Sequence, residues 1–330
     1  MAEAEVGDDQ YGEDPSVNRL QEEAAQLLGK EAALFLPSGT MANQVALKVF
    51  TRPGDDVIVP WEPHLVFHET GAAAANSGVQ FTVVGGDRGA YDVNDLQAAV
   101  KVRGHLMYPP SSLVVIENTH NRAGGTVFPQ ADAVAVCSAA SAAGLASYCD
   151  GARLLNAAVA SGRAPAELAA PFDMVSLSLS KGLGAPAGSL LAGRRDDIAR
   201  AVRYRRMLGG AMRQVGILAA AGSVALAQNV ERLADDHANA RLIGEELVAS
   251  PAIGVELDRV QTNIVVFDVA DAPSFVAACR ASGVLLNAFT LHRVRAVTHL
   301  DVDREACQAA VEVMLTVAGV DRVWTSSDRT

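Results

Sequence analysis

The chain has 330 residues, a mass of 34.4 kDa and a formal net charge of −11 at pH 7. This length suits one large domain and a smaller one, and a chain that is 50% hydrophobic can bury a sizeable core. The acidic balance argues against nucleic acid and anionic membranes as partners, because both carry negative charge.

The sequence predicts a soluble, cytoplasmic protein without a bound metal. Its longest apolar stretch, residues 215–227, is interrupted by two glycines and is shorter than the ~20 residues of a membrane span. The N-terminus is acidic and lacks the layout of a signal peptide. The four cysteines lie far apart, which favours reduced thiols over disulfides or a metal site.

Short β-rich runs alternate with helical runs, the pattern of a parallel sheet covered by helices. The predicted strands are residues 33–36, 56–60, 80–84, 113–117, 145–150, 174–179 and 188–191. The predicted helices are residues 41–50, 65–77, 93–102, 130–142 and 154–160. A long amphipathic helix at 230–248 then leads into strands at 263–268 and 293–298 and a helix at 304–317. We therefore predict a large domain over residues 1–228 and a small α/β domain over 229–330.

The segment from Pro37 to Met41 follows a predicted strand and opens a predicted helix. Backbone N–H groups at a helix N-terminus bind phosphate, and the glycine at position 39 permits close approach. Thr40 adds a hydroxyl donor. Taken alone, the segment fits an ordinary helix N-cap equally well.

Asp150 ends an apolar predicted strand and begins the segment Asp-Gly-Ala-Arg. Ligands of parallel sheets bind outside the carboxyl ends of the strands. A carboxylate there is able to keep a pyridine nitrogen protonated, so that the ring accepts electrons. By itself, an aspartate at this point is more often a turn residue or a helix cap.

Lys181 also follows an apolar strand and begins a glycine-rich turn. Partial burial lowers the pKa of a lysine and frees a neutral amine that attacks aldehydes. The other three lysines, Lys30, Lys48 and Lys101, are predicted to be solvated surface charges.

The order of phosphate cup, aspartate and lysine, each at a strand end, is the layout of pyridoxal-phosphate (PLP) enzymes with the aspartate aminotransferase fold (fold type I). Within that group, the chain closely resembles the low-specificity L-threonine aldolases of the threonine aldolase and β-eliminating lyase family. The matching segments span nearly the whole chain; they are residues 7–15, 37–43, 117–125, 150–153, 179–184, 209–214 and 294–301.

The resemblance implies that Lys181 carries PLP as a Schiff base and that Asp150 pairs with the pyridine nitrogen. Gly39 and Thr40 would bind the phosphate with help from Arg213. His64 would stack on the cofactor ring.

On the substrate side, the resemblance implies that His120 lies near the β-hydroxyl group. Arg153, beside the cofactor, and Arg295 would grip the carboxylate, a task that suits the planar guanidinium. Tyr11 would line the site at a subunit interface. His68 departs from the family pattern and is predicted to be a surface histidine.

The implied reaction is the reversible cleavage of L-threonine, L-allo-threonine and related β-hydroxy-α-amino acids to glycine and an aldehyde, by a homodimer or homotetramer. His64 and His120 are both candidates for the base, acting directly or through water. The same motifs would serve a β-eliminating lyase or a transaldolase.

Family members carry a further segment, of Arg-Ser-Asp-Thr type, upstream of residues 7–9, and its serine contacts the substrate carboxylate. Only six residues precede Gly7 here. Either translation starts further upstream, or a carboxylate ligand is lost, which would fit a catalytically weak PLP-binding homologue.

Overall fold

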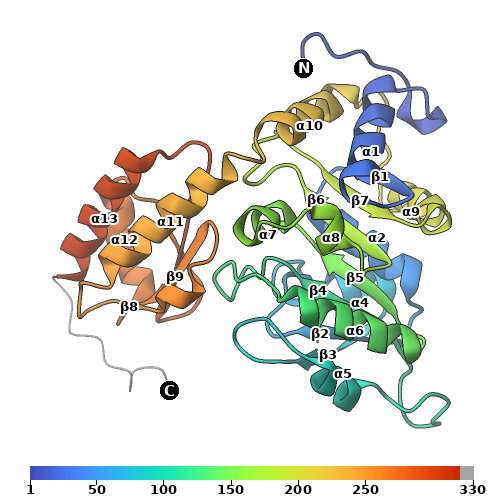
Figure 1. Ribbon diagram of the computed structural model, residues 1–330, viewed down its shortest axis with the longest axis horizontal. Coiled ribbons are helices and arrows are strands. Elements are labelled where there is room, and N and C mark those ends of the chain that lie inside the picture. Colours follow the sequence, from blue (N-terminus) through green and yellow to red (C-terminus); the bar gives the residue numbers. More distant parts are fainter. Residues whose placement is uncertain (320–330) are drawn as a thin grey trace.

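The computed structural model describes residues 1–319 as two lobes (Figure 1). The large lobe contains a seven-stranded sheet, and the small lobe contains a four-stranded sheet. The tail of the predicted small domain, residues 320–330, lies outside the described residues.

The large sheet has the strand order β1-β7-β6-β5-β4-β2-β3. Its strands are β1 Ala32–Leu36, β2 Asp56–Pro60, β3 Gln80–Val84, β4 Ser111–Glu117, β5 Ala146–Asp150, β6 Met174–Ser178 and β7 Ser189–Gly193. Neighbours are parallel, except that β7 runs antiparallel to both β1 and β6. The carboxyl ends of β4, β5 and β6 therefore meet at one edge of the sheet.

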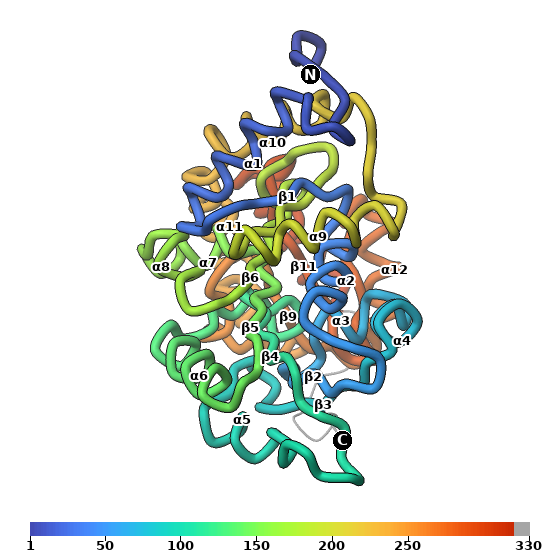
Figure 2. Tube along the Cα trace, turned by 90° about the vertical axis from the view of Figure 1, so that its right-hand side faces the viewer, coloured from blue at the N-terminus to red at the C-terminus, as the bar shows by residue number. Residues whose placement is uncertain are grey.

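Helices cover both faces of this sheet (Figures 1 and 2). They are α1 Pro15–Leu27, α2 Gly39–Phe50, α3 His64–Phe67, α4 Ala72–Ser77, α5 Val93–Ala99, α6 Gln130–Ala142, α7 Leu154–Ser161, α8 Pro165–Ala169, α9 Arg195–Met207 and α10 Gly216–Gln228, with a 3₁₀ turn at Asp9–Tyr11. Alternate residues of one strand point to opposite faces. Accordingly Phe35 packs in one core, whereas Leu34 and Leu36 pack in the other.

The small lobe has its own core and an antiparallel sheet of order β10-β11-β9-β8. Its elements are α11 Leu233–Leu247, β8 Gly254–Val255, a 3₁₀ turn at Leu257–Arg259, β9 Ile264–Asp268, α12 Ala272–Ala281, β10 Asn287–Ala288, β11 Arg293–Val297 and α13 Arg304–Ala318. Leu233 at the start of α11 packs in the large-lobe core, and Leu247 at its end packs in the small-lobe core. A boundary between residues 228 and 229, just before this helix, stays a prediction.

All nine predicted strands are present, with ends that shift by one or two residues. The prediction of one helix over 65–77 is wrong, because two short helices occupy that span. Thr70 and Gly71 between them have φ angles of 54° and 73°, which lie in the left-handed region and interrupt a right-handed helix.

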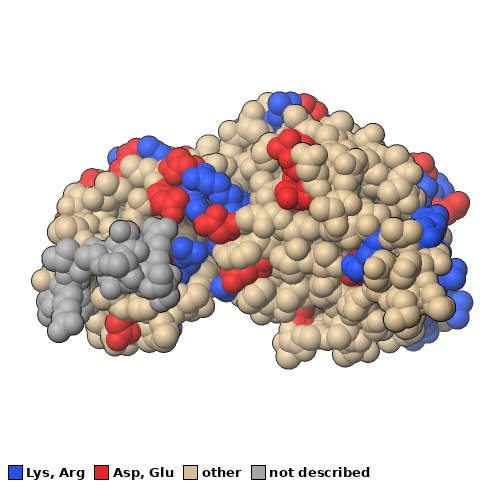
Figure 3. Space-filling model, turned by 90° about the horizontal axis from the view of Figure 1, so that it is seen from below, with Lys and Arg blue, Asp and Glu red and all other residues tan. Residues whose placement is uncertain are grey.

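Charged side chains of both signs gather where the lobes meet, on the face drawn in Figure 3. Arg88 pairs with Asp258 at 2.6 Å, and Arg259 pairs with Asp87 at 2.7 Å. The Thr262 hydroxyl donates to the carbonyl oxygen of Gly125 at 2.7 Å. These contacts join the loops after β3 and β4 to the small lobe.

Within the described chain, no helix combines the length and the apolar character that a membrane crossing requires. All four cysteines are buried and unpaired.

Gly188, just before β7, has a φ of 110°, and a Cβ there would lie 2.5 Å from Cε2 of Phe35. We expect Gly188→Ala to cost about 1–2 kcal/mol in backbone strain and about 1–3 kcal/mol in overpacking. Gly283→Ala is the matched control, because its φ is 87° but nothing lies within 4 Å of the added Cβ. Chemical denaturation should show the larger loss for Gly188→Ala, and equal losses would contradict the predicted clash.

Candidate active site

A small cavity lies at the sheet edge where β4 and β5 end, and the loop after β6 closes it. Five of the predicted site residues line it: Gly39, His64, Asp150, Arg153 and Lys181. The fold therefore brings together residues that are up to 142 positions apart, from 39 to 181.

The N-terminus of α2 forms one end of this cavity. Ser38 is the N-cap, and its Oγ accepts a hydrogen bond from the Met41 N–H at 3.2 Å. The N–H groups of Gly39 and Thr40 have no backbone or side-chain acceptor among the described residues. A Cβ on Gly39 would meet nothing within 4 Å, so the space in front of it is open. A twelve-residue helix that begins in this way offers N–H donors and a favourable dipole to an anion.

Asp150 is fixed at the end of β5 by a buried network. The Asn43 amide nitrogen donates to Asp150 Oδ2 at 2.9 Å and to Glu69 Oε1 at 2.6 Å. The carbonyl oxygen of the same amide accepts from the Tyr148 hydroxyl at 2.5 Å. Asp150 Oδ1 has one contact, from the Ala152 N–H at 3.3 Å. The carboxylate is therefore held in place while one oxygen keeps acceptor capacity.

His64 is held over this network by two carboxylates. Its Nδ1 lies 2.9 Å from Glu69 Oε1, and its backbone N–H donates to Glu117 Oε2 at 2.7 Å. Burial lowers the pKa of His64, but the hydrogen bond to Glu69 and the nearby carboxylates outweigh it, so the pKa is raised above its usual value. His68 is exposed, and its ring centroid lies 5.3 Å from that of His64.

Lys181 differs from the other lysines in having no partner for its amine in the described chain. Lys30 donates to the Phe172 carbonyl oxygen, Lys48 to that of Asn76, and Lys101 pairs with Asp56. The prediction that these three are solvated surface charges is wrong for Lys30 and Lys101, which are partly buried. Burial, followed by the charge of Arg153, lowers the pKa of Lys181 to about 8.

The two predicted carboxylate-binding arginines behave differently. The Arg153 guanidinium lines the cavity and has no hydrogen-bond or ion-pair partner among the described residues. Burial, together with the nearby Arg295 charge, lowers the pKa of Arg153 to about 10. Arg295, on β11 of the small lobe, donates to Asn121 Oδ1 at 2.7 Å and packs on the Phe289 ring.

Five predicted site residues do not line the cavity of this chain: Thr40, Arg295, His120, Tyr11 and Arg213. His120 is 1% exposed and stacks on Trp61; its Nδ1 accepts from the Ala123 N–H at 3.1 Å, and its Nε2 has no partner in residues 1–319. Tyr11 is 72% exposed. Arg213 lies in an exposed loop and pairs with Asp8 at 2.6 Å. Their catalytic and binding roles stay predictions.

Sequence reasoning gave no role to five other residues of the cavity: Asn43, Glu117, Thr119, Asn121 and Ala152. All five lie in or beside the segments that carried the resemblance. The sequence does indicate a place for Asn43 in the site. It follows Gly39 by one helical turn, so both residues lie on the same face of the helix. Glu117 pairs in register with Asp150 on the neighbouring strand. Its place in the site could be predicted only if the order of the strands in the sheet were known.

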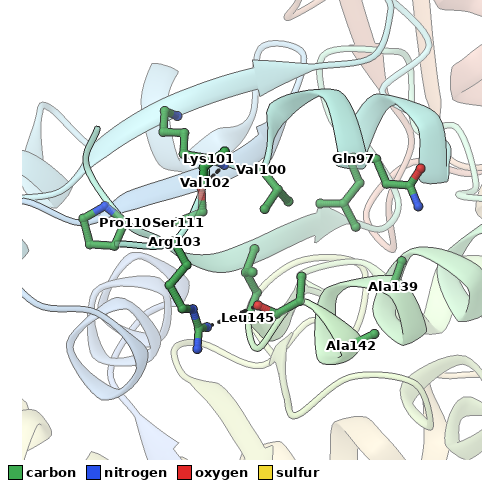
Figure 4. A pocket seen from close by; sticks show the side chains of 12 residues that line it. Gln97, Val100, Lys101, Val102, Arg103, Pro110, Ser111, Ala139, Ala142 and Leu145 are labelled. Carbon is green, nitrogen blue, oxygen red and sulfur yellow. Dashed lines mark hydrogen bonds between the residues drawn. The ribbon is translucent and has the colours of Figure 1, made fainter. Parts of the chain in front are cut away.

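A second, larger cavity lies between α5, α6 and the start of β4 (Figure 4). Its walls are mainly aliphatic, and its two cations are already engaged. Lys101 pairs with Asp56, and Arg103 donates to the carbonyl oxygens of Ala143 and Gly144. This cavity therefore offers no free side chain for catalysis.

The first cavity has the groups that PLP requires. An amine with a lowered pKa faces it, a fixed carboxylate stands at a strand end, and a helix N-terminus offers anion-binding N–H groups. The unpartnered Arg153 leaves one further positive charge for an acidic substrate. The described residues thus fit the cofactor that the sequence predicts.

Solved structures define the class of the fold. A Leishmania major threonine aldolase structure superposes with a TM-score of 0.79 at 22% identity, covering 96% of this chain and 93% of that one. At that identity the likeness shows the fold alone. The chain has the fold type I architecture of PLP enzymes, which confirms the predicted fold class.

The sequence comparisons define the family. The model of the beta-eliminating lyase family matches residues 1–272. The Escherichia coli (strain K12) low specificity L-threonine aldolase is 43% identical over 92% of this chain and 90% of its own length. The Arabidopsis thaliana low-specificity L-threonine aldolase 1 is 38% identical over 91% and 86%. The chain belongs to the beta-eliminating lyase family.

Because Glu69 supplies the hydrogen bond that raises the pKa of His64, Glu69→Gln should lower that pKa. The pH titration of the His64 imidazole, followed by NMR, measures the change directly. Glu22→Gln, at an exposed position, is the control and should leave the pKa of His64 unchanged. An unchanged titration in Glu69→Gln would show that other carboxylates set the charge of His64.

Proposed function

We propose that this chain is a PLP-dependent carbon–carbon lyase that cleaves L-threonine, L-allo-threonine and related β-hydroxy-α-amino acids to glycine and an aldehyde. The observation that carries the proposal is the partly buried Lys181 amine, which shares one cavity with Asp150 and an unpartnered Arg153. The threonine aldolase names of the relatives support the same substrate class.

The chain's own residues hold the cofactor. The lowered pKa of Lys181 leaves a substantial fraction of neutral amine near pH 8 for bonding to the cofactor aldehyde. Asp150, held by Asn43, would accept the hydrogen bond of the protonated ring nitrogen. Gly39 and Thr40 would donate backbone N–H groups to the phosphate. When bound, PLP supplies a conjugated ring that takes up the electron pair of the breaking bond.

Arg153 would bind the substrate carboxylate and thereby set the direction of the Cα–Cβ bond. A carboxylate would also relieve the repulsion that Arg295 imposes on Arg153. Arg295 would contribute a second donor once the substrate competes with Asn121 for its guanidinium. Arginine suits this role because its planar donors pair with both carboxylate oxygens.

His64 would take the proton of the β-hydroxyl group. As that proton leaves, the oxygen forms the aldehyde carbonyl and the Cα–Cβ bond breaks; protonation of Cα then gives glycine. His64 lines the cavity, whereas His120 does not line it and packs against Trp61. Such a positioned base contributes roughly 10²–10⁴-fold to a rate. His120 would act on the hydroxyl group indirectly, by supporting the wall of the site.

In a homodimer or homotetramer with sites shared between subunits, Tyr11 would line the site at the subunit interface and Arg213 would help to bind the phosphate. Both are exposed in the single chain, and the helix N-terminus that would bind phosphate is open. A cytoplasmic location is supported by the four buried, unpaired cysteines, which are typical of a reducing compartment.

The purified protein, incubated with PLP and L-threonine, should form acetaldehyde and glycine in equal amounts, and Lys181→Ala should form neither. Borohydride treatment should fix the cofactor on Lys181, as mass spectrometry would show, and should fix none in Lys181→Ala. Ammonia and a keto acid as products would instead identify a β-eliminating lyase.

Arg153→Ala should raise the KM for threonine steeply, because the loss of a charged hydrogen bond costs about 1.5–3 kcal/mol, equivalent to roughly 10- to 150-fold. Arg293→Ala is the control, because Arg293 pairs with Asp268 outside the cavity. Similar KM values for both variants would place carboxylate binding elsewhere.

A further inference from the structure

Thr119 lines the cofactor cavity, and its hydroxyl group has no partner among the described residues. Thr119 is 3% exposed, and its Oγ1 makes no hydrogen bond with any residue in the described part of the chain. It lies two residues beyond the end of β4, and it lines the same cavity as Asp150 and Lys181.

An unpaired hydroxyl is costly inside a protein, at about 1–3 kcal/mol. Six other buried side-chain atoms in residues 1–319 also lack a partner, among them Ser77 Oγ and Ser112 Oγ. None of the six belongs to a residue that lines this cavity. Among these seven buried atoms of the described residues, Thr119 Oγ1 is therefore the one that belongs to a residue of this cavity.

The polar groups of PLP show which of its atoms the Thr119 hydroxyl would contact. Its phosphate matches the N-terminus of α2, its ring nitrogen matches Asp150, and its aldehyde matches Lys181. The ring hydroxyl oxygen, on the carbon next to the aldehyde, is the polar group that remains. It needs a donor, which the carboxylates of the cavity do not provide.

Arg153 and Lys181 are assigned above to the substrate carboxylate and the cofactor aldehyde, and most of the other polar side chains of the cavity already have partners. Asn43 joins Asp150 to Glu69, and Glu117 accepts from two backbone N–H groups. The Asn121 carbonyl oxygen accepts from Arg295, which leaves its amide nitrogen as the competing donor. We propose that the Thr119 hydroxyl donates a hydrogen bond to the ring hydroxyl oxygen of bound PLP. This inference rests on the proposed cofactor.

Thr119→Val removes the hydroxyl and keeps the shape of the side chain. Holoenzyme dialysed against graded concentrations of PLP should show a Kd about 5- to 10-fold higher for this variant, because one hydrogen bond is lost. Thr119→Ser keeps the hydroxyl donor and should bind PLP with nearly the same Kd as the original chain. Ser77→Ala is the matched control, since it removes an unpartnered buried hydroxyl away from the cavity.

Two further readouts separate this role from a structural one. The pH at which the visible absorbance of the loaded protein changes should rise in Thr119→Val, because a donated hydrogen bond favours the deprotonated ring oxygen. The thermal unfolding midpoint without cofactor should stay equal or rise, because an unsatisfied hydroxyl is gone. If the hydroxyl instead stabilised the fold, its removal would lower this unfolding midpoint.

The outcomes distinguish the two proposals. If the original chain retains no PLP, the proposed cofactor is wrong and this inference fails with it. If the original chain retains PLP and Thr119→Val retains it equally well, only the Thr119 assignment is overturned. A change confined to the KM for threonine would also overturn it, by assigning the hydroxyl to the substrate.

Discussion

The amide of Asn43 joins the parts of the site that the fold supplies separately. Its nitrogen links Asp150 on β5 to Glu69 beyond α3, and its oxygen is fixed by Tyr148. Glu69 in turn holds His64. One buried side chain therefore sets both the carboxylate that we propose for the cofactor nitrogen and, through Glu69, the imidazole that we propose for the substrate. Hydrogen bonds to charged groups in such surroundings are worth about 1.5–3 kcal/mol each.

The site also keeps polar groups that the protein does not satisfy. Lys181 and Arg153 are cations without a partner in the described chain, and the Thr119 hydroxyl has none. A pairing within the chain would lower the free energy of the empty protein, but it would have to be broken before a ligand bound. Arg295 of the small lobe differs, because it already has partners. It donates a hydrogen bond to Asn121 and packs on the Phe289 ring. A neutral amide is a partner that a carboxylate displaces readily.

The sequence predicted much of the fold and the centre of the site. Asp150 and Lys181 could be found because each ends an apolar strand, and parallel strands place such ends at one edge. The prediction of one helix over 65–77 is wrong, because Thr70 and Gly71 adopt left-handed φ angles that interrupt it. Glu117 and Thr119 received no role, because their significance depends on strand order and on which polar atoms lack partners. Neither property is visible in a linear pattern.

Trp61, one of the chain's two tryptophans, stacks on His120, whose neighbour in the chain, Thr119, lines the cavity. Indole emits in the near ultraviolet, where a bound yellow chromophore absorbs. Energy transfer from Trp61 would therefore dim its fluorescence whenever the neighbouring cavity is filled. The protein thus carries an intrinsic optical reporter of its own loading, at a position fixed by the rings that support the site.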